Sequence, residues 1–266
     1  TLGATLDRIA GEKAGIVKPT MPVVSGVTQQ AAVDVIRRTC RERGARFIDA
    51  RHAVRFERED ASGLVFASQR TRYRGIRLAL DGRHQIDNAR VAVAAYECLM
   101  ERIGRRPRPA AVRQALSRVR WAGRLERLVP AAGPPALVFD AAHNPAGVEA
   151  LARHLRLAAS TPPVLLFGAT SGKPLERMLE PLAALVAAAV ISRPQVERGL
   201  DAEEVAVVAR RFLSVVEVVP DPALAVVRAR ELAGCDRDVL VAGSLYLVGQ
   251  VMGLLAERTV PGPVAM

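Results

Sequence analysis

The stretch Ala136-Leu137-Val138-Phe139-Asp140-Ala141-Ala142-His143-Asn144-Pro145 decides the fold of the second half of the chain. Its first five residues form an apolar run that ends on a carboxylate, which predicts a buried strand at 136–140. Pro145 suits the first turn of a helix, so His143 and Asn144 are expected in a tight turn at a helix N-terminus. A strand that leads directly into a helix is the repeating unit of parallel α/β sheets.

The same alternation of strand and helix continues to the end of the chain. Further strands are expected at 164–168, 188–192, 215–219 and 239–243, and helices at 145–158, 174–187, 201–212, 221–233 and 244–257. Uninterrupted apolar strands between helices predict a mostly parallel, Rossmann-like α/β sheet that is covered on both faces. Ligands of such sheets bind beyond the carboxyl ends of the strands.

The first part of the chain has a different pattern. Helices are expected at 5–14, 29–43, 84–103 and 110–119, a short strand at 22–26, and an antiparallel meander over 46–80. The residues Trp121-Ala122-Gly123-Arg124 are interpreted as a hinge. The sequence therefore predicts two domains, residues 1–120 and 121–266.

Composition narrows the classes of function. The chain has 266 residues, of which half are apolar, and no uncharged apolar run reaches the roughly 18 residues that a membrane span needs. Three widely spaced cysteines without a CxxC pair indicate reduced thiols and a cytoplasmic protein. The net charge is +11, but the arginines are scattered and aromatic residues make up only 4%. We therefore expect no nucleic-acid partner, while small anionic ligands remain compatible.

Three groups of polar residues follow predicted strands in the second half. Asp140 and His143 either hold a ligand at a helix N-terminus or serve as a cap and a surface residue. Ser244 follows the strand at 239–243, where it either caps the last helix or holds a carboxylate. Lys173 ends the glycine-rich loop 168–173, which either cradles phosphate or is a solvated loop. This loop is not a P-loop, because Pro174 follows Lys173.

Three further candidates lie at or before the predicted hinge. Arg124 either clamps a phosphate or forms a surface ion pair with Glu126. Gln85 and Asn88 share one helical face, where their carboxamides either read the edge of a base or cap the helix. Lys13 lies near a helix end, a place that favours a cation in any case.

Together and in this order, the motifs resemble the folylpolyglutamate synthase/dihydrofolate synthase branch of the Mur ligase superfamily. They run along essentially the whole chain: Leu2-Gly3, Ile9–Ile16, Gly82–Ala89, Gly123–Glu126, Asp140–Pro145, Lys173 and Gly243–Tyr246. The resemblance implies that residues 1–120 are the C-terminal part of a central ATPase domain. It also implies that residues 121–266 are a Rossmann-like glutamate-ligase domain.

The resemblance further implies an ATP-dependent ligase that adds L-glutamate to a folate or to dihydropteroate through an acyl phosphate. ATP and Mg²⁺ would be the cofactors, and the family is generally monomeric. The implied roles are adenine contact for Asn88, phosphate or ribose contact for Arg124, ribose for Asp140, and nucleotide for Lys173. His143 and Ser244 would lie near glutamate or the γ-phosphate, and Lys13 would be carbamylated and hold the metal.

Some family features are missing or changed. The sequence contains no G-x-x-G-K-[GS]-S loop, so the chain is interpreted as a fragment that is inactive alone. Ala141 replaces a glycine of the family pattern, and Pro174 replaces an aspartate after Lys173. Two other interpretations remain open, a peptidoglycan Mur ligase and a non-catalytic remnant or nucleotide-binding module of the same superfamily.

Overall fold

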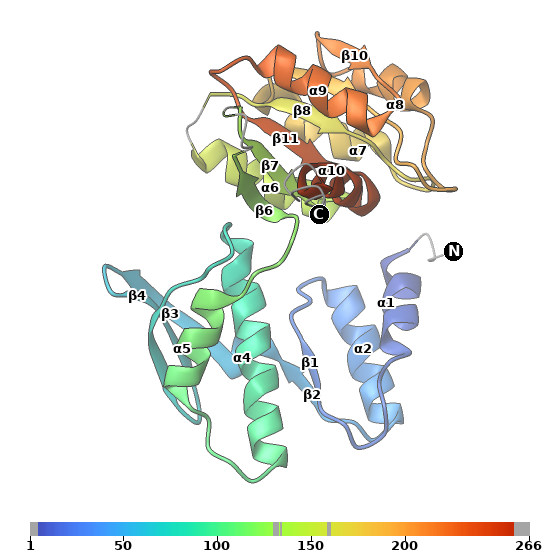
Figure 1. Cartoon of the computed structure of the whole chain (residues 1–266). Coiled ribbons are helices and arrows are strands. Elements are labelled where there is room, and N and C mark those ends of the chain that lie inside the picture. Colours follow the sequence, from blue (N-terminus) through green and yellow to red (C-terminus); the bar gives the residue numbers. More distant parts are fainter. Residues whose placement is uncertain (1–4, 130–132, 134, 159–160, 258–266) are drawn as a thin grey trace, which may run out of the picture. The chain divides into compact units, whose positions relative to one another are not determined.

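The computed structural model describes residues 5–129, 133, 135–158 and 161–257, so the Leu2-Gly3 motif lies outside the described residues. The chain divides into two compact units, Thr1–Arg120 and Trp121–Met266 (Figure 1). Each unit has its own sheets and its own apolar core, and each is described by itself.

The second unit contains one six-stranded sheet. Its strands are β6 (Arg124–Leu128), β7 (Leu137–Asp140), β8 (Val164–Phe167), β9 (Ala188–Ile191), β10 (Val216–Val218) and β11 (Val239–Ala242). Their order across the sheet is β10-β9-β8-β11-β7-β6. All neighbours pair in parallel except β6, which runs antiparallel to β7. The structure thus confirms the predicted α/β fold with a mostly parallel sheet.

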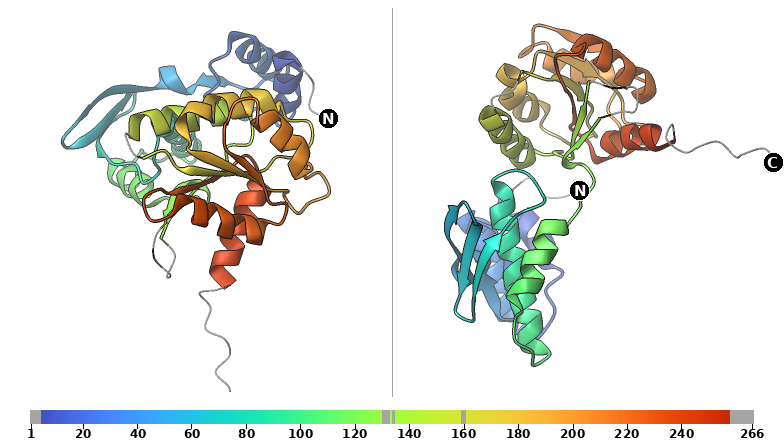
Figure 2. Two further views of the ribbon diagram at one scale, coloured as in Figure 1. Left: turned by 90° about the horizontal axis from the view of Figure 1, so that it is seen from above. Right: turned by 60° about the vertical axis from the view of Figure 1, so that its left-hand side comes forward.

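Helices cover both faces of this sheet (Figures 1 and 2). One face packs against α6 (Pro145–Ala158), α7 (Leu175–Leu179) and α8 (Ala202–Ala209), and the other against α9 (Pro222–Ala233) and α10 (Leu245–Glu257). Along β8, Leu165 and Phe167 enter the first core while Val164 and Leu166 enter the second. Burial on both faces explains why these strands are continuous apolar runs.

Two expectations for this unit were wrong. The helix expected at 174–187 ends early, as α7 is followed by a 3₁₀ helix at Glu180–Leu185. Pro181 has no N–H for an α-helical bond and so favours this break. The residues interpreted as a hinge include Arg124, which instead begins the edge strand β6.

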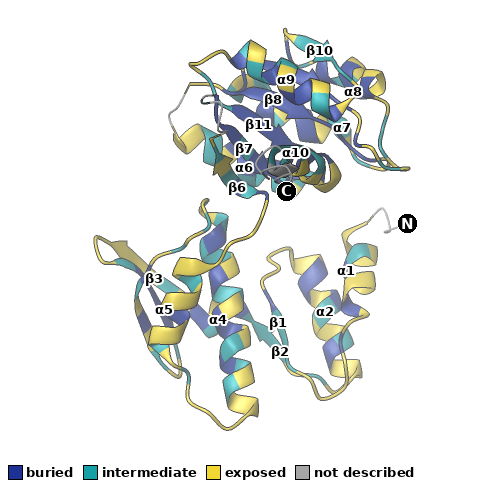
Figure 3. Ribbon diagram, in the orientation of Figure 1, coloured by how far each residue is buried: buried dark blue, intermediate teal, exposed yellow. Residues whose placement is uncertain are grey.

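In the first unit, an antiparallel sheet packs against two helices (Figure 3). Its strands are β3 (Val54–Asp60), β4 (Gly63–Ser68) and β5 (Arg72–Ile76), and the helices are α4 (His84–Arg102) and α5 (Pro109–Arg118). Phe66, Tyr73 and Ile76 are fully buried between the sheet and these helices. The meander is therefore confirmed in type, but its last strand, expected at 76–80, lies at Arg72–Ile76 instead.

A second small sheet corrects the assignment of Phe47-Ile48. This pair lies in β2 (Phe47–Asp49), which pairs in parallel with β1 (Val23–Ser25) and is not part of the meander. The helix α2 (Gln30–Glu42) connects the two strands, and α1 (Leu6–Ala14) packs on α2. A helical crossover between two strands is the expected link of a parallel pair.

Close backbone contacts at the carboxyl ends of β8 and β11 require a glycine at 243. Gly243 has φ +96°, and a Cβ there would lie 2.5 Å from the Phe167 ring and 2.6 Å from the Gly168 oxygen. Any side chain would therefore add both steric overlap and backbone strain. Gly249, in α10 of the same unit, faces open space, and a Cβ added there would meet no neighbouring atom within 4 Å.

We predict that Gly243→Ala lowers the free energy of unfolding by roughly 2 kcal/mol or more, because it combines overpacking with a strained φ. Gly249→Ala is the matched control and should stabilise the helix by about 0.5–1 kcal/mol. Urea unfolding followed by circular dichroism measures both. Equal effects of the two substitutions would contradict the close approach seen at Gly243.

Candidate functional site

Most of the predicted site residues of the second unit gather at the carboxyl edge of its sheet. The strands β8, β11 and β7 are neighbours, and they end at Phe167, Ala242 and Asp140. The loop 168–173, Ser244 and the turn 141–144 therefore follow three adjacent strands at one edge. Because β6 is antiparallel to β7, Arg124 starts at that same edge, directly opposite Asp140.

Asp140 is a buried carboxylate, only 5% exposed, that joins two strand ends. Its Oδ1 accepts a hydrogen bond from the Ala142 N–H at 2.9 Å, and its Oδ2 accepts one from the Leu125 N–H at 3.2 Å. Burial raises the pKa of Asp140 above its ordinary value of 3.8, although the backbone donors and the nearby Arg124 oppose this. Both carboxylate oxygens thus already serve the local fold.

Leu125 explains why a carboxylate is needed there. The pairing of β6 with β7 shifts register between Arg124 and Glu126, and Leu125 adopts φ +51° at this bulge. A left-handed conformation costs a residue with a side chain about 1 kcal/mol. The hydrogen bond to Asp140 and burial of the Leu125 side chain offset this cost. The bulge fixes the direction in which the neighbouring Arg124 leaves the strand.

Glu126 also supports the backbone of this turn. Its Oε2 accepts a hydrogen bond from the Gly123 N–H at 3.0 Å, and the Ala141 N–H donates to the Gly123 carbonyl at 2.7 Å. Within the part of the chain that the structure describes, Arg124 forms no ion pair with Glu126. The surface ion pair considered as an alternative for Arg124 is therefore absent, and its half-buried guanidinium lies near Asp140.

His143 has a defined orientation in the turn after β7. Its Nδ1 lies 2.8 Å from the Ala141 carbonyl oxygen. A carbonyl only accepts, so Nδ1 carries the proton, and in the neutral ring Nε2 is left as an acceptor. Asn144 accepts a hydrogen bond from the Gly147 N–H at 2.9 Å, which is the expected helix cap. Ala141 does not have a positive φ, so the replacement of glycine introduces no strain there.

Ser244 and the loop 168–173 flank this turn. Ser244 is 2% exposed, and its Oγ accepts a hydrogen bond from the Tyr246 N–H at 3.2 Å, so it caps α10. The loop is tied to residues 198–200 by a bridge between Thr170 and Gly199 and by the Ser171 N–H donating to the Arg198 carbonyl at 2.8 Å. Lys173 is half-buried at the end of this anchored loop.

The two remaining predicted residues belong to the first unit. Asn88 is exposed on α4, and its Nδ2 donates to Gln85 Oε1 at 2.9 Å. Gln85 is buried and also hydrogen-bonds with His84 at 3.0 Å, so the two carboxamides form a connected pair. Lys13 is exposed in the last turn of α1. Among the described residues, no cluster of three His, Cys, Asp or Glu side chains is suited to holding a metal ion.

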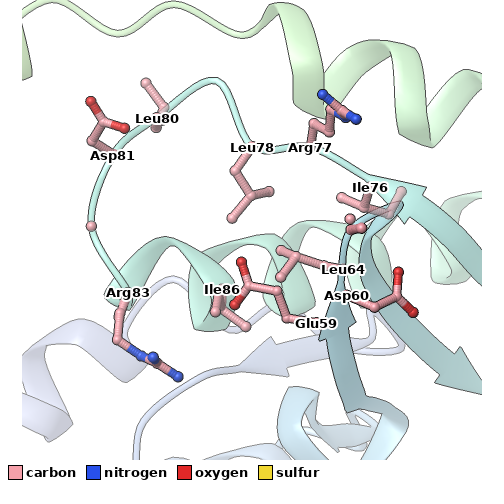
Figure 4. Close-up of a pocket in the computed structure, with 13 residues that line it drawn as sticks. Glu59, Asp60, Leu64, Ile76, Arg77, Leu78, Leu80, Asp81, Arg83 and Ile86 are labelled. Atoms are coloured by element: carbon pink, nitrogen blue, oxygen red, sulfur yellow. The ribbon is translucent and has the colours of Figure 1, made fainter.

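The first unit also has an open cavity of about 440 Å³ that sequence reasoning missed (Figure 4). It lies between the β3–β4 hairpin, β5 and the segment leading into α4. Leu78 points into it from above, and Glu59 and Ile86 are among the residues that line it. Gly82 and Arg83 line the cavity, but none of the predicted site residues does. No sequence signal marks it, because its walls come from three separate segments.

The geometry of the second unit can be compared with known proteins. Residues 123–245 match the family model described as Mur ligase, glutamate ligase domain. The chain is also 30% identical to dihydrofolate synthase/folylpolyglutamate synthase of Bacillus subtilis (strain 168), covering 94% of this chain and 58% of the relative.

The chain is similar to folylpolyglutamate and dihydrofolate synthases over nearly its whole length.

Further comparisons agree with this relation to the folylpolyglutamate and dihydrofolate synthases. Dihydrofolate synthetase of Saccharomyces cerevisiae is 26% identical over 94% of this chain and 61% of that protein. Crystal structures of Mycobacterium tuberculosis folylpolyglutamate synthase complexed with ADP and AMPPCP superpose with a TM-score of 0.83 at 28% identity, covering 96% of this chain and 60% of that one. The chain thus spans about three fifths of the length of these relatives. No helix among the described residues is long and apolar enough to cross a membrane.

The raised pKa of Asp140 predicts a pH dependence of stability. The folded state binds this proton more tightly than the unfolded state, so the contribution of Asp140 decreases as pH rises from about 4 through the folded pKa. Relative to Asp140→Asn, which does not titrate, the wild type should lose free energy of unfolding between pH 4 and pH 7.5. Urea unfolding of both proteins over this range measures the difference.

Glu217 provides a control of opposite sign in the same unit. Its hydrogen bonds with Arg228 lower its pKa, so the wild type should gain stability relative to Glu217→Gln as pH rises. The raised pKa of Asp140 would be contradicted if the free energy of unfolding of the wild type, relative to that of Asp140→Asn, stayed constant or grew with pH.

Proposed function

We propose that this chain is part of an ATP-dependent ligase that joins L-glutamate to a folate or to dihydropteroate through an acyl phosphate. The observation that carries the proposal is the gathering of Arg124, Asp140, His143 and Ser244 at one sheet edge, within residues that match the glutamate ligase domain. The Bacillus subtilis relative, which is named for both activities, is longer than this chain, which covers 58% of it, so we assign the activity to a polypeptide that includes this segment.

The edge is suited to binding anions. The helices α6 and α10 begin there, and their first N–H groups attract carboxylates and phosphates. Arg124 and Lys173 supply positive charge at the same edge, which would stabilise a transferred phosphoryl group. In the proposed reaction, the folate-side carboxylate attacks the γ-phosphate of ATP and releases ADP. The glutamate amine then attacks the acyl phosphate, forming an amide and releasing phosphate.

The role that we propose for each side chain follows from the hydrogen-bonding positions that its local contacts leave free. His143 offers Nε2 as an acceptor, because Nδ1 is held by the Ala141 carbonyl, and so it is suited to orienting the glutamate amine. Arg124 contacts a nucleotide phosphate or ribose oxygen. We assign Asn88 to a contact with adenine and Lys173 to a contact with the nucleotide. Ser244 holds a glutamate carboxylate in addition to capping α10. Asp140 contacts ribose only through lone pairs that its two backbone donors leave free.

Mg²⁺ is expected from the resemblance, but the described residues do not form a metal site of their own. Lys13, if carbamylated, would supply one ligand, and it is exposed in this structure. We therefore derive no step through the metal. A cytoplasmic, monomeric enzyme without nucleic-acid partners completes the proposal, and the three free cysteines agree with a reducing compartment.

The first experiment is glutamate incorporation by the gene product extended upstream of Thr1. Dihydropteroate, a reduced folate and a nucleotide-linked muropeptide would each be offered with ATP and Mg²⁺. Incorporation into either pteridine acceptor supports the proposal and shows whether one or both reactions occur. Incorporation into the muropeptide alone would establish a peptidoglycan ligase instead, and a frame that opens at Thr1 would favour a non-catalytic module.

The variant Arg124→Gln tests whether Arg124 contacts the nucleotide at this sheet edge. Loss of a charged phosphate contact should raise the KM for ATP about tenfold or more, with little change in fold. Arg127→Gln is the matched control, since the exposed Arg127 lies on the same strand and pairs with Asp238. Steady-state kinetics of the extended enzyme measures both. Similar KM values for the two variants would remove Arg124 from the nucleotide site.

Lys13→Ala tests the carbamate role. Turnover of the extended enzyme should fall by at least about a hundredfold if one metal ligand is lost, and short-chain carboxylic acids should partly restore it. Lys18→Ala is the control, as Lys18 is exposed nearby in the sequence and has no assigned role. Normal turnover of Lys13→Ala without added acid would exclude the carbamate.

A further inference from the structure

The net positive charge of this protein comes entirely from the first of its two units. Residues 1–120 contain 24 Lys and Arg against 12 Asp and Glu, a net charge of +12, whereas residues 121–266 contain 14 against 15, a net charge of −1. A genome-wide preference for arginine codons would act on both units alike. The composition of the genome therefore does not explain the excess of basic over acidic residues in the first unit. The interpretation of the arginines as scattered along the whole chain is thus wrong.

The excess is most concentrated around α5. Residues 102–120 contain seven arginines and no aspartate or glutamate. We define the α5 arginine surface as five of these, which are exposed on α5 and on the loop before it: Arg105, Arg106, Arg108, Arg113 and Arg118. Figure 3 shows this loop and most of α5 as exposed.

The α5 surface has no acidic side chain within its own segment, whereas α2, which carries Arg38 and Arg41, likewise unpaired among the described residues, also contains Asp34 and Glu42. Arg46, Arg51 and Arg72 each pair with a carboxylate at 2.6–2.8 Å. Within the described part of the chain, none of the five forms an ion pair; Arg113 donates instead to the Arg74 carbonyl at 3.4 Å. Clustered like charges without counter-charges repel one another, so an anion that neutralises them is favoured.

The loop holds three of these guanidinium groups on a stiff backbone. Its sequence is Arg105-Arg106-Pro107-Arg108-Pro109, in which each proline fixes its own φ and restricts the residue before it. The Arg108 N–H donates to the Tyr96 hydroxyl at 3.0 Å, which ties the loop to α4. A preorganised backbone reduces the entropy lost when a ligand binds.

We propose that the α5 arginine surface binds the oligo-anionic tail of γ-linked glutamate residues on the substrate. This inference rests on the proposed function. Each ligation consumes one carboxylate of the acceptor and brings two with the incoming glutamate, so the tail gains one negative charge per cycle. A row of unpaired guanidinium groups matches such a chain of carboxylates. Residues 104–118 contain no Phe, Tyr or Trp, so this segment itself supplies none of the stacking side chains of a site for single-stranded nucleic acid.

The test is binding of fluorescently labelled γ-linked pentaglutamate, without folate, to the 266-residue chain by fluorescence anisotropy. Arg105→Gln/Arg106→Gln should weaken binding about tenfold at low salt and flatten its salt dependence. The matched control is Arg38→Gln/Arg41→Gln, which removes the same charge from exposed positions on α2 of the same unit. This control should change the affinity less than twofold. Circular dichroism verifies that both variants are folded.

Three outcomes would overturn the proposal. The wild type fails to bind the probe at low salt, both double variants weaken binding equally, or an oligothymidylate of equal charge binds more tightly than pentaglutamate. The last result would assign the surface to nucleic acid. The assay uses neither ATP nor ligation, so a failure of the tail site is distinguishable from a failure of the proposed function. Glutamate transfer to tail-free dihydropteroate without pentaglutamate binding would disprove the tail site alone.

Discussion

The second unit depends on one buried carboxylate. Asp140 ends β7, and its two oxygens hold the Leu125 N–H of β6 and the Ala142 N–H of the following turn. These bonds compensate for the left-handed Leu125 and set the direction of both Arg124 and the turn that carries His143. An unpaired N–H in this buried place would cost about 1–3 kcal/mol. The position of the candidate site therefore follows from a requirement of the fold.

Much of the fold could be predicted because its strands are buried on both faces. Val164–Phe167 and Val239–Ala242 are apolar without interruption, and such runs between helices have few other interpretations. The edge strand β6 was missed for the opposite reason. Its five residues, Arg124–Leu128, mix charged and apolar types without regular alternation and follow a glycine, a pattern that also fits a hinge. Only the pairing with β7 distinguishes a strand from a hinge here. Phe47–Asp49 was assigned to the wrong sheet, because a strand of three residues carries no sign of its partner.

The location of the candidate site could be predicted from the sequence, but the roles of its residues only partly. Strand ends followed by Asp140, Lys173 and Ser244 indicated the carboxyl edge, and adjacency of β7, β11 and β8 brings their loops together. From the sequence alone, Asp140 and Ser244 could each be a helix cap or a ligand contact. The structure shows the local bonds of Asn144 and Ser244 to helix N-termini. A cap and a ligand contact are compatible, since a hydroxyl or amide has more than one hydrogen-bonding position.

The distribution of charge separates two physical tasks between the units. The sheet edge of the second unit lies in a nearly neutral unit and relies on oriented N–H groups and a few placed cations, which act over short distances and define geometry. The first unit carries a surplus of exposed, largely unpaired arginines, whose attraction reaches about a Debye length and depends on salt. Under the proposed function, a substrate whose charge grows with every added glutamate gains most from this long-range attraction. A field strong enough to hold a long tail would also hold every released phosphate, so an edge that lies in a nearly neutral unit avoids strong non-specific retention of anions.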